Sequence, residues 1–179
     1  VIVPIGGGGL ASGISTAIKA RRPDIEVIGV ETKLYPSMYE GIHDQPFTGG
    51  GVTIAEGIAV KQPGGKTLEI CKRLLDDILL VEEAAIERAI QMLIEIEKTV
   101  VEGAGAAPLA ALLDHPERFA GRKVCVVVSG GNIDSRLLAQ VLMRGMAREG
   151  RLVRIRVEIP DVPGALARIS SLIGQAEAN

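Results

Sequence analysis

The residues with the clearest chemical potential in this sequence are four consecutive glycines, residues 6–9 (the glycine run), between an apolar segment and a segment with helical spacing. Because glycine has no Cβ, the backbone of such a run can approach a ligand closely, and the free N–H groups at the start of the next helix point at it. A plain tight turn would not need four residues that each add entropy to the unfolded chain. The run therefore predicts an anion cradle, with phosphate as the expected ligand.

Two kinds of phosphate ligand fit this cradle. A dinucleotide fits because Gly6, Gly8 and Ala11 satisfy the G-x-G-x-x-G/A fingerprint, and Glu31 ends the next apolar segment at about the right distance for a ribose hydroxyl. A smaller phosphate ester such as pyridoxal phosphate also fits, held by the loop alone. The spacing of the residues leaves both alternatives open.

A second glycine-containing loop, residues 129–132 with the sequence Ser-Gly-Gly-Asn (the serine loop), follows another apolar segment. Open α/β sheets bind ligands at the carboxyl ends of their strands, so the Ser129 hydroxyl could reach a ring nitrogen or another ligand atom. Alternatively, Ser129 or Asn132 caps the helix expected from Ile133. One residue can serve both roles.

The elements that must position these loops follow from the hydropathy pattern. Continuous apolar runs predict strands buried on both faces, at residues 1–5, 25–31, 78–81 and 123–128. Helical spacing of apolar residues predicts helices, over residues 10–20, 82–98, 102–113 and 133–148. The strand–loop–helix–strand order indicates parallel pairing. The predicted fold class is therefore α/β, an open parallel sheet with helices on both faces, and residues 32–67 are loop-rich.

The composition excludes several classes of protein. The chain has 179 residues, a net charge of -2, no Trp, two Tyr and two Phe, which is poor equipment for binding nucleic acid. No apolar run approaches the ~20 residues that a membrane span needs. Cys71 and Cys125 stand in apolar stretches without metal-type spacing, and we expect both to be buried thiols in a reducing compartment, the cytoplasm.

A domain boundary is expected near residues 149–150. Beyond it, residues 152–159 alternate between apolar and charged side chains, which is typical of a half-exposed strand and differs from the apolar strands before it. We therefore expect two domains, residues 1–149 and the tail, residues 150–179. Because Val1 opens inside an apolar run and the tail stops after one expected strand and helix, we expect the chain to be an internal fragment of a longer protein.

Taken together, these segments resemble the C-terminal part of threonine dehydratases (threonine ammonia-lyases). That family belongs to the fold-type II, tryptophan synthase β-like, pyridoxal-phosphate enzymes, with serine racemase and serine dehydratases as relatives. The resemblance rests on four motifs in family order: residues 6–10 (GGGGL), 54–60 (IAEGIAV), 102–105 (EGAG) and 129–132 (SGGN). In the tail, residues 161–166 (DVPGAL) resemble the opening of an ACT regulatory domain, an α+β domain of which only the first strand and helix are present.

The resemblance implies roles for individual residues in binding pyridoxal 5'-phosphate. The glycine run and Leu10 would hold the phosphate, Ser129 would hydrogen-bond the pyridine nitrogen, Glu102 would lie near the ring, and Gly57 would bring backbone up to the cofactor. A neutral hydroxyl on the pyridine nitrogen suits β-elimination. The expected cofactor-binding residues are Gly6, Gly7, Gly8, Gly9, Leu10, Gly57, Glu102 and Ser129.

The family forms its Schiff base with a lysine that would lie upstream of Val1. None of the lysines in this chain has the surrounding motif, so no catalytic residue is expected here and the chain alone is expected to be inactive. Glu31 would be a structural acid or a ligand for a monovalent or divalent cation, although residues 32–37 hold no second carboxylate. In the tail, an amino-acid effector would bind at Asp161, Pro163, Gly164 and Ala165.

The function implied by the resemblance is the conversion of L-threonine to 2-oxobutanoate and ammonia, with weaker action on L-serine, by a homo-oligomer, a dimer or a tetramer. The alternatives are a serine racemase or serine dehydratase of the same family, an NAD-dependent dehydrogenase that uses the glycine run and Glu31, and a non-catalytic amino-acid sensor. We expect no nucleic-acid partner and no membrane contact.

Overall fold

The computed structural model describes residues 1–177. Three strands, one 3-10 helix and eight α-helices follow one another in this part of the chain: β1 (Ile2–Pro4), α1 (Gly9–Arg21), β2 (Ile28–Thr32), α2 (Ser37–Ile42), η1 (Glu56–Ile58), α3 (Gly65–Leu74), β3 (Asp77–Val81), α4 (Glu83–Glu95), α5 (Gly103–Asp114), α6 (Pro116–Phe119), α7 (Ser135–Arg148) and α8 (Ala165–Gln175). Within residues 1–177 no helix has the length and apolar character that crossing a membrane requires.

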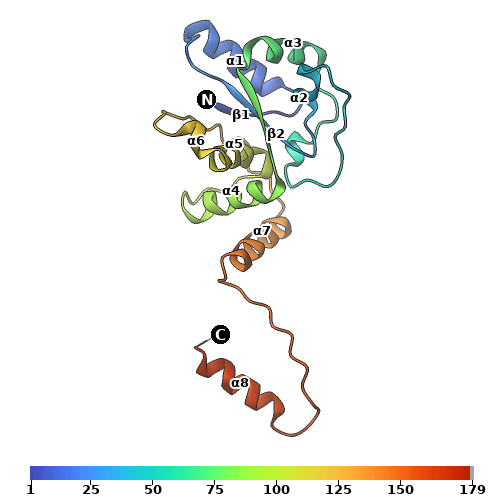
Figure 1. Ribbon diagram of the computed structural model, residues 1–179, viewed down its shortest axis with the longest axis vertical. Coiled ribbons are helices and arrows are strands. Elements are labelled where there is room, and N and C mark those ends of the chain that lie inside the picture. Colours follow the sequence, from blue (N-terminus) through green and yellow to red (C-terminus); the bar gives the residue numbers. More distant parts are fainter. Residues whose placement is uncertain (178–179) are drawn as a thin grey trace.

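The three strands form a parallel sheet in the order β1-β2-β3 (Figure 1). Ile2 of β1 pairs with Ile28 of β2, and Ile28 in turn pairs with Asp77 of β3. Parallel neighbours need crossover connections, which the helices supply. The predicted α/β class and the parallel sheet are therefore confirmed, with strand ends shifted by a few residues from the apolar runs.

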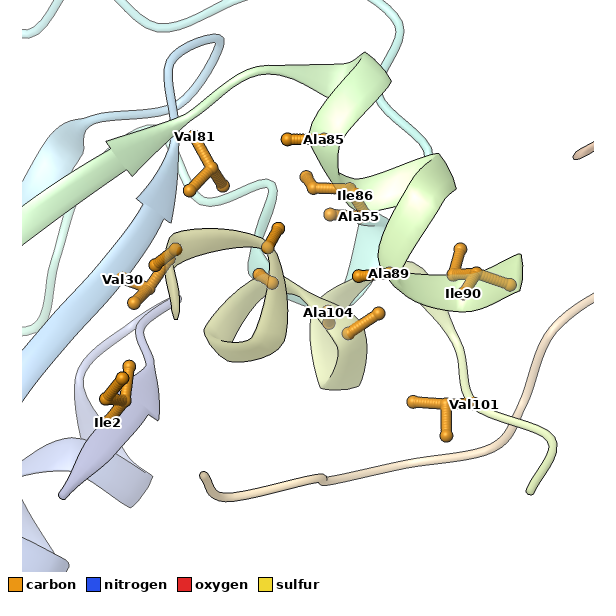
Figure 2. Close-up of a cluster of buried hydrophobic side chains, with 14 of the residues drawn as sticks. Ile2, Val30, Ala55, Val81, Ala85, Ile86, Ala89, Ile90, Val101 and Ala104 are labelled. Atoms are coloured by element: carbon orange, nitrogen blue, oxygen red, sulfur yellow. The ribbon is translucent and has the colours of Figure 1, made fainter. Parts of the chain in front are cut away.

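Both faces of the sheet are buried, as the fully apolar strands predict. Ile2 of β1 points into one apolar cluster and its neighbour Val3 into the other, because successive side chains of a strand point to opposite faces. The first cluster lies between the sheet and helices α4 and α5; Figure 2 shows Ile86 and Ile90 of α4 facing it. The second lies on the opposite face, toward α1, α2 and α3.

Seven of the 12 residues of helix α5 are glycine or alanine, and the helix contacts all three strands. Small side chains allow its backbone to approach the sheet more closely than a leucine-rich helix could, at the cost of lower burial per residue. Gly103 and Gly105 in its first turn are buried, as are the alanines behind them. The first turn of α5 thus packs against Ile54 and Ser129, in two of the loops near the carboxyl ends of the strands.

The predicted buried strand at residues 123–128 is wrong in its burial. This segment runs parallel to β1 and makes only an isolated bridge, in which the Ile2 amide donates to the Cys125 carbonyl (2.8 Å) and the Val127 amide to the Ile2 carbonyl (3.0 Å). Its other edge has no backbone partner among residues 1–177, so it stays half-exposed. Cys125 is consequently an exposed thiol rather than a buried one, whereas Cys71 is buried as expected.

The tail also departs from the prediction. Residues 152–159 form no strand, because a strand needs a neighbour for its backbone N–H and C=O groups and residues 1–177 offer none. They are exposed, and Figure 1 shows them leading away from the sheet to α8, which has no buried residue. The predicted helix of the tail is present as α8, while the predicted ACT strand is not.

The loop-rich segment 32–67 contains the short helices α2 and η1 and leads into α3. Glu31, at the end of β2, organises its first part. Its two carboxylate oxygens accept hydrogen bonds from the backbone amides of Met38 and Tyr39, each at 2.8 Å, in the first turn of α2. Burial raises the pKa of Glu31 to about 7, opposed by these two amides and reinforced by the nearby Glu40.

This pKa predicts a pH-dependent stability. The pKa of Glu31 is near 4.5 in the unfolded chain and about 7 in the folded protein. Between these two pH values the folded state therefore binds more protons than the unfolded state. The free energy of unfolding should therefore fall as the pH rises through this interval, by roughly 3 kcal/mol at most. Urea unfolding of wild-type protein and Glu31→Gln across this pH interval would measure it.

The substitution Glu31→Gln should remove this pH dependence, because an amide does not titrate. Glu69→Gln, on the exposed side of α3, serves as the matched control and should leave the slope of the wild type in place. An equal slope in Glu31→Gln and in the wild type would mean that another group carries the effect.

Candidate functional site

The glycine run lies at the carboxyl end of β1 and lines a cavity of about 210 Å³ (the glycine cavity). All eight residues predicted from the resemblance to bind cofactor line this one cavity, although they come from four separate parts of the chain. Its walls are formed by Pro4, Gly6, Gly7, Gly8, Gly9, Leu10, Gly57, Ile58, Glu102, Ala104 and Ser129.

The backbone of the glycine run presents unpaired donors to this cavity. Gly8 stands at the N-cap position of α1 in the left-handed region, with φ 88°, and no side chain caps the helix. Among residues 1–177, no protein group accepts a hydrogen bond from the amides of Gly7, Gly8, Gly9 or Leu10. Free amides at the positive end of a helix dipole form an anion-binding site.

Another wall comes from η1, through Gly57 and Ile58. The run lies against it so closely that a Cβ added to Gly6 would stand 3.1 Å from the Gly57 carbonyl oxygen. The segment leading into η1 is held by Glu83, in the first turn of α4. Its carboxylate accepts hydrogen bonds from the Ile54 amide (2.7 Å) and from the hydroxyls of Thr53 (2.7 Å) and Thr32 (2.8 Å).

Glu83 is a site residue that the sequence does not reveal. An acid in the first turn of a helix is common, and nothing in the sequence around Glu83 or Thr53 indicates that they meet. Only the folded chain brings residues 32, 53 and 83 together, across three different elements. Their role is to fix the wall of the cavity, since none of them lines it.

Glu102 and the serine loop complete the cavity. Glu102 stands at the N-cap position of α5, and its carboxylate packs against Gly130, where an added Cβ would lie 2.1 Å from Oε1. Gly130 has φ 77°, a conformation that favours glycine. The serine loop is seated on α5, because a Cβ added to Gly105 would lie 1.9 Å from the Ser129 carbonyl oxygen.

The serine loop does not cap the helix that follows it. Helix α7 is capped by Asp134, whose Oδ1 accepts hydrogen bonds from the amides of Arg136 (2.9 Å) and Leu137 (3.1 Å). The capping interpretation of Ser129 and Asn132 is therefore wrong. In the part of the chain that the structure describes, the Ser129 hydroxyl has no hydrogen-bond partner and stands in the cavity wall.

A second cavity of about 550 Å³ adjoins the first and shares Gly57, Glu102 and Ala104 with it. Its further walls come from η1, the end of the serine loop and the start of α7. The glycine cavity is thus the inner end of a larger space at the carboxyl ends of the strands, which is the usual ligand-binding position in open α/β sheets.

The remaining predicted site residues lie elsewhere. Glu31 is buried beneath α2 and lines neither cavity. Of the four predicted effector residues, Asp161, Pro163 and Gly164 are exposed, and Ala165 alone lines a cavity of about 300 Å³ between residues 158–162 and α8. Within residues 1–177, no three His, Cys, Asp or Glu side chains gather as a metal site would require.

The parallel sheet and the free amides at a helix start define an α/β protein with an anion-binding site at the carboxyl ends of its strands, of a kind that suits a small phosphate ester. A family profile described as "Pyridoxal-phosphate dependent enzyme" matches residues 1–130. The chain belongs to this family. The resemblance drawn from the motifs is therefore confirmed at the family level, and pyridoxal phosphate is the cofactor that the family implies.

Individual relatives agree with this assignment. An L-threonine ammonia-lyase of Geobacter sulfurreducens is 47% identical over 185 aligned residues, covering 100% of this chain and 45% of the relative. Among solved structures, a threonine deaminase of T.th. superposes with a TM-score of 0.70 at 35% identity, over 74% of this chain and 49% of the other. Maize serine racemase superposes with a TM-score of 0.69 at 33% identity, over 83% of this chain and 47% of the racemase. This chain spans about half the length of the relatives that it matches.

The residues present fit pyridoxal phosphate. The free amides of the glycine run suit a phosphate dianion, and the Ser129 hydroxyl, unpaired within residues 1–177, suits a ring nitrogen. The cradle also depends on glycine itself: a Cβ on Gly8 would stand 2.5 Å from Cε of Met38. None of the chain's lysines lines either cavity.

The close contact between α5 and the serine loop gives a testable prediction. Gly105→Ala should lower the free energy of unfolding by about 1–3 kcal/mol, because the new methyl group must displace the Ser129 backbone. Gly13→Ala, in α1, adds the same methyl group where nothing lies within 4 Å, and should be neutral or stabilising by up to ~1 kcal/mol. Chemical unfolding of both variants measures the difference, and equal effects would contradict the contact.

Proposed function

We propose that the protein to which this chain belongs is a pyridoxal-phosphate-dependent lyase that converts L-threonine to 2-oxobutanoate and ammonia, with weaker action on L-serine. The observation that carries the proposal is the glycine cavity, which is lined both by the glycine run with its free backbone amides and by Ser129. The choice of threonine is supported by the relative named L-threonine ammonia-lyase that aligns along the whole chain.

In this proposal each wall of the cavity has one task. The amides of the glycine run bind the cofactor phosphate, and Leu10 and the Gly57 backbone enclose it. Ser129 donates its hydroxyl proton to, or accepts one from, the pyridine nitrogen, and Glu102 lies beside the ring. When bound, pyridoxal phosphate supplies an electron sink for negative charge at the amino-acid α-carbon. A neutral partner such as Ser129 leaves that sink weaker than a carboxylate would, which favours β-elimination.

The amine that holds the cofactor is proposed to come from outside these residues. Lys61 and Lys66, the lysines nearest in sequence to η1, are exposed and absent from the cavity walls. We therefore expect this chain alone to bind the phosphate weakly and to release no product from threonine.

The rival functions are separated by particular observations. The dehydrogenase alternative needs Glu31 at a ribose hydroxyl, whereas both Glu31 oxygens accept amides of α2. The racemase alternative is supported by the superposition with maize serine racemase, at 33% identity, but the relative that aligns along the whole chain at 47% identity is named L-threonine ammonia-lyase. The sensor alternative needs a protein that binds an amino acid without turnover.

The experiment that tests the proposal uses the complete native protein. Borohydride reduction followed by peptide mass mapping should reveal one pyridoxyl-lysine, outside the sequence printed here, and L-threonine should yield 2-oxobutanoate. Formation of D-serine from L-serine without keto acid would establish the racemase instead. Absence of any modified lysine would overturn the cofactor assignment and leave the dehydrogenase or the sensor.

A substitution of Ser129 tests the role of the serine loop. Ser129→Ala in the complete protein should weaken pyridoxal phosphate binding about fivefold, since one hydrogen bond is lost, and should lower kcat for threonine. Its free energy of unfolding should stay within about 0.5 kcal/mol of the wild type, because the hydroxyl has no partner among residues 1–177. Ser135→Ala, at the exposed start of α7, is the control and should change neither quantity. Unchanged cofactor titration in Ser129→Ala would remove Ser129 from the site.

The tail is proposed to be the start of a regulatory domain that binds an amino-acid effector, in a cytoplasmic homo-oligomer. The support is the exposed apolar side chains of residues 152–159 and of α8, which require cover from something beyond these residues. Calorimetry of the complete protein with threonine and with isoleucine tests the effector. Heat from threonine alone, abolished by an unreactive substrate analogue, would assign it to the active site instead.

A further inference from the structure

The carbonyl group of Gly7 is held on the side of the loop that faces α3. Thr67, in the first turn of α3, donates its hydroxyl to the Gly7 carbonyl oxygen at 2.6 Å, and the Gly64 amide points to the same oxygen at 3.4 Å. The Thr67 hydroxyl also lies 2.9 Å from the Gly64 carbonyl oxygen, and its single proton is better placed for the shorter contact. Thr67 does not line the glycine cavity.

This contact fixes the orientation of one peptide group. In a trans peptide the C=O and the following N–H point in opposite directions. Because the Gly7 carbonyl is held toward α3, the Gly8 amide is turned away from α3, and Gly8 is a wall of the glycine cavity. Glycines on both sides place few limits on this peptide, so without a tether it could rotate. A rotated peptide would bring a carbonyl oxygen, which repels an anion, into the cradle.

Packing around Gly8 reinforces the tether. A Cβ on Gly8 would lie 2.9 Å from both Cβ and Oγ1 of Thr67, so the side chain fills the space directly behind the loop. Gly8, with φ 88°, is also the N-cap residue of α1. Thr67 therefore fixes the loop by a hydrogen bond and by contact at the residue where the chain turns into the helix.

We propose that Thr67 is a positioning residue for the phosphate cradle: it holds the Gly7–Gly8 peptide so that amides, and not a carbonyl, face the phosphate. The proposal rests on the proposed function, because it concerns the same cavity. It adds a residue from α3, which neither the motifs nor the walls of the cavity identify. The expected consequence is a loss of affinity that is specific to the phosphate group of the ligand.

The test compares pyridoxal 5'-phosphate with pyridoxal on the complete apoprotein of Thr67→Val, Thr67→Ser and wild type. Pyridoxal carries the same ring and aldehyde without the phosphate, so the ratio of the two Kd values isolates the cradle. Thr67→Val keeps the shape of threonine but lacks the hydroxyl, and should weaken pyridoxal phosphate binding on the order of tenfold while leaving pyridoxal binding unchanged. Thr67→Ser should behave like the wild type.

A second readout is the ³¹P NMR signal of the bound phosphate, which should move in Thr67→Val and not in Thr67→Ser. Thr16→Val removes an exposed hydroxyl on α1 and is the matched control, expected to change neither quantity. If the Thr67→Val protein does not fold, Thr67→Ala serves as the second variant, with the same expected loss of preference for pyridoxal phosphate over pyridoxal.

The outcomes separate this inference from the proposed function. Equal weakening of both ligands in Thr67→Val would show a general structural role and overturn the positioning role. An unchanged preference for the phosphate in both Thr67→Val and Thr67→Ala would overturn it as well. A wild type that binds pyridoxal as tightly as pyridoxal phosphate would overturn the phosphate cradle itself, and with it the proposed function.

Discussion

The close approach of helix α5 to its surroundings is the constraint on which the rest of the structure depends. A Cβ on Gly103 would lie 2.3 Å from the Ile54 carbonyl oxygen, and one on Gly105 would lie 1.9 Å from that of Ser129. The segment that leads into η1 and the serine loop therefore both pack on the first turn of one helix. Because the same helix packs on all three strands, the distance between these two segments is tied to the hydrophobic core.

One buried and one half-buried carboxylate, Glu31 and Glu83, hold the irregular segment in place through hydrogen bonds. The Glu31 carboxylate accepts hydrogen bonds from two backbone amides of α2. The Glu83 carboxylate accepts hydrogen bonds from one backbone amide and two hydroxyl groups of residues that precede η1. Each satisfies backbone groups that have no strand or helix partner, which is the requirement for burying a loop. The fixed loop in turn places Gly57 against the glycine run. Polar interactions thus fix the loops of the site, while apolar packing fixes the positions of the sheet and helices.

The sequence predicts well what depends on local patterns and poorly what depends on distant partners. Apolar runs identify β1, β2 and β3, and the four motifs of the family resemblance contain every wall residue of the glycine cavity except Pro4. Residues 123–128 and 152–159 have strand-like patterns, but among residues 1–177 the first segment has a backbone partner on one edge alone and the second has none. The cap at Asp134 is a local contact of a usual capping residue, so the sequence does carry a signal for it. The roles of Glu83 and Thr67 arise from contacts between distant segments that no local pattern encodes.

The half-exposed segment 123–128 also bears on how this chain behaves in isolation. Its sequence, KVCVVV, is rich in β-branched residues and carries one charge, at Lys123. Beside it lies an apolar groove formed by Met92, Ile96, Leu109 and Val128. Open strand edges of this composition recruit further strands, including those of other molecules. In a concentrated preparation, aggregation through this edge would compete with solubility, and a charged residue in place of Val128 would act as a gatekeeper.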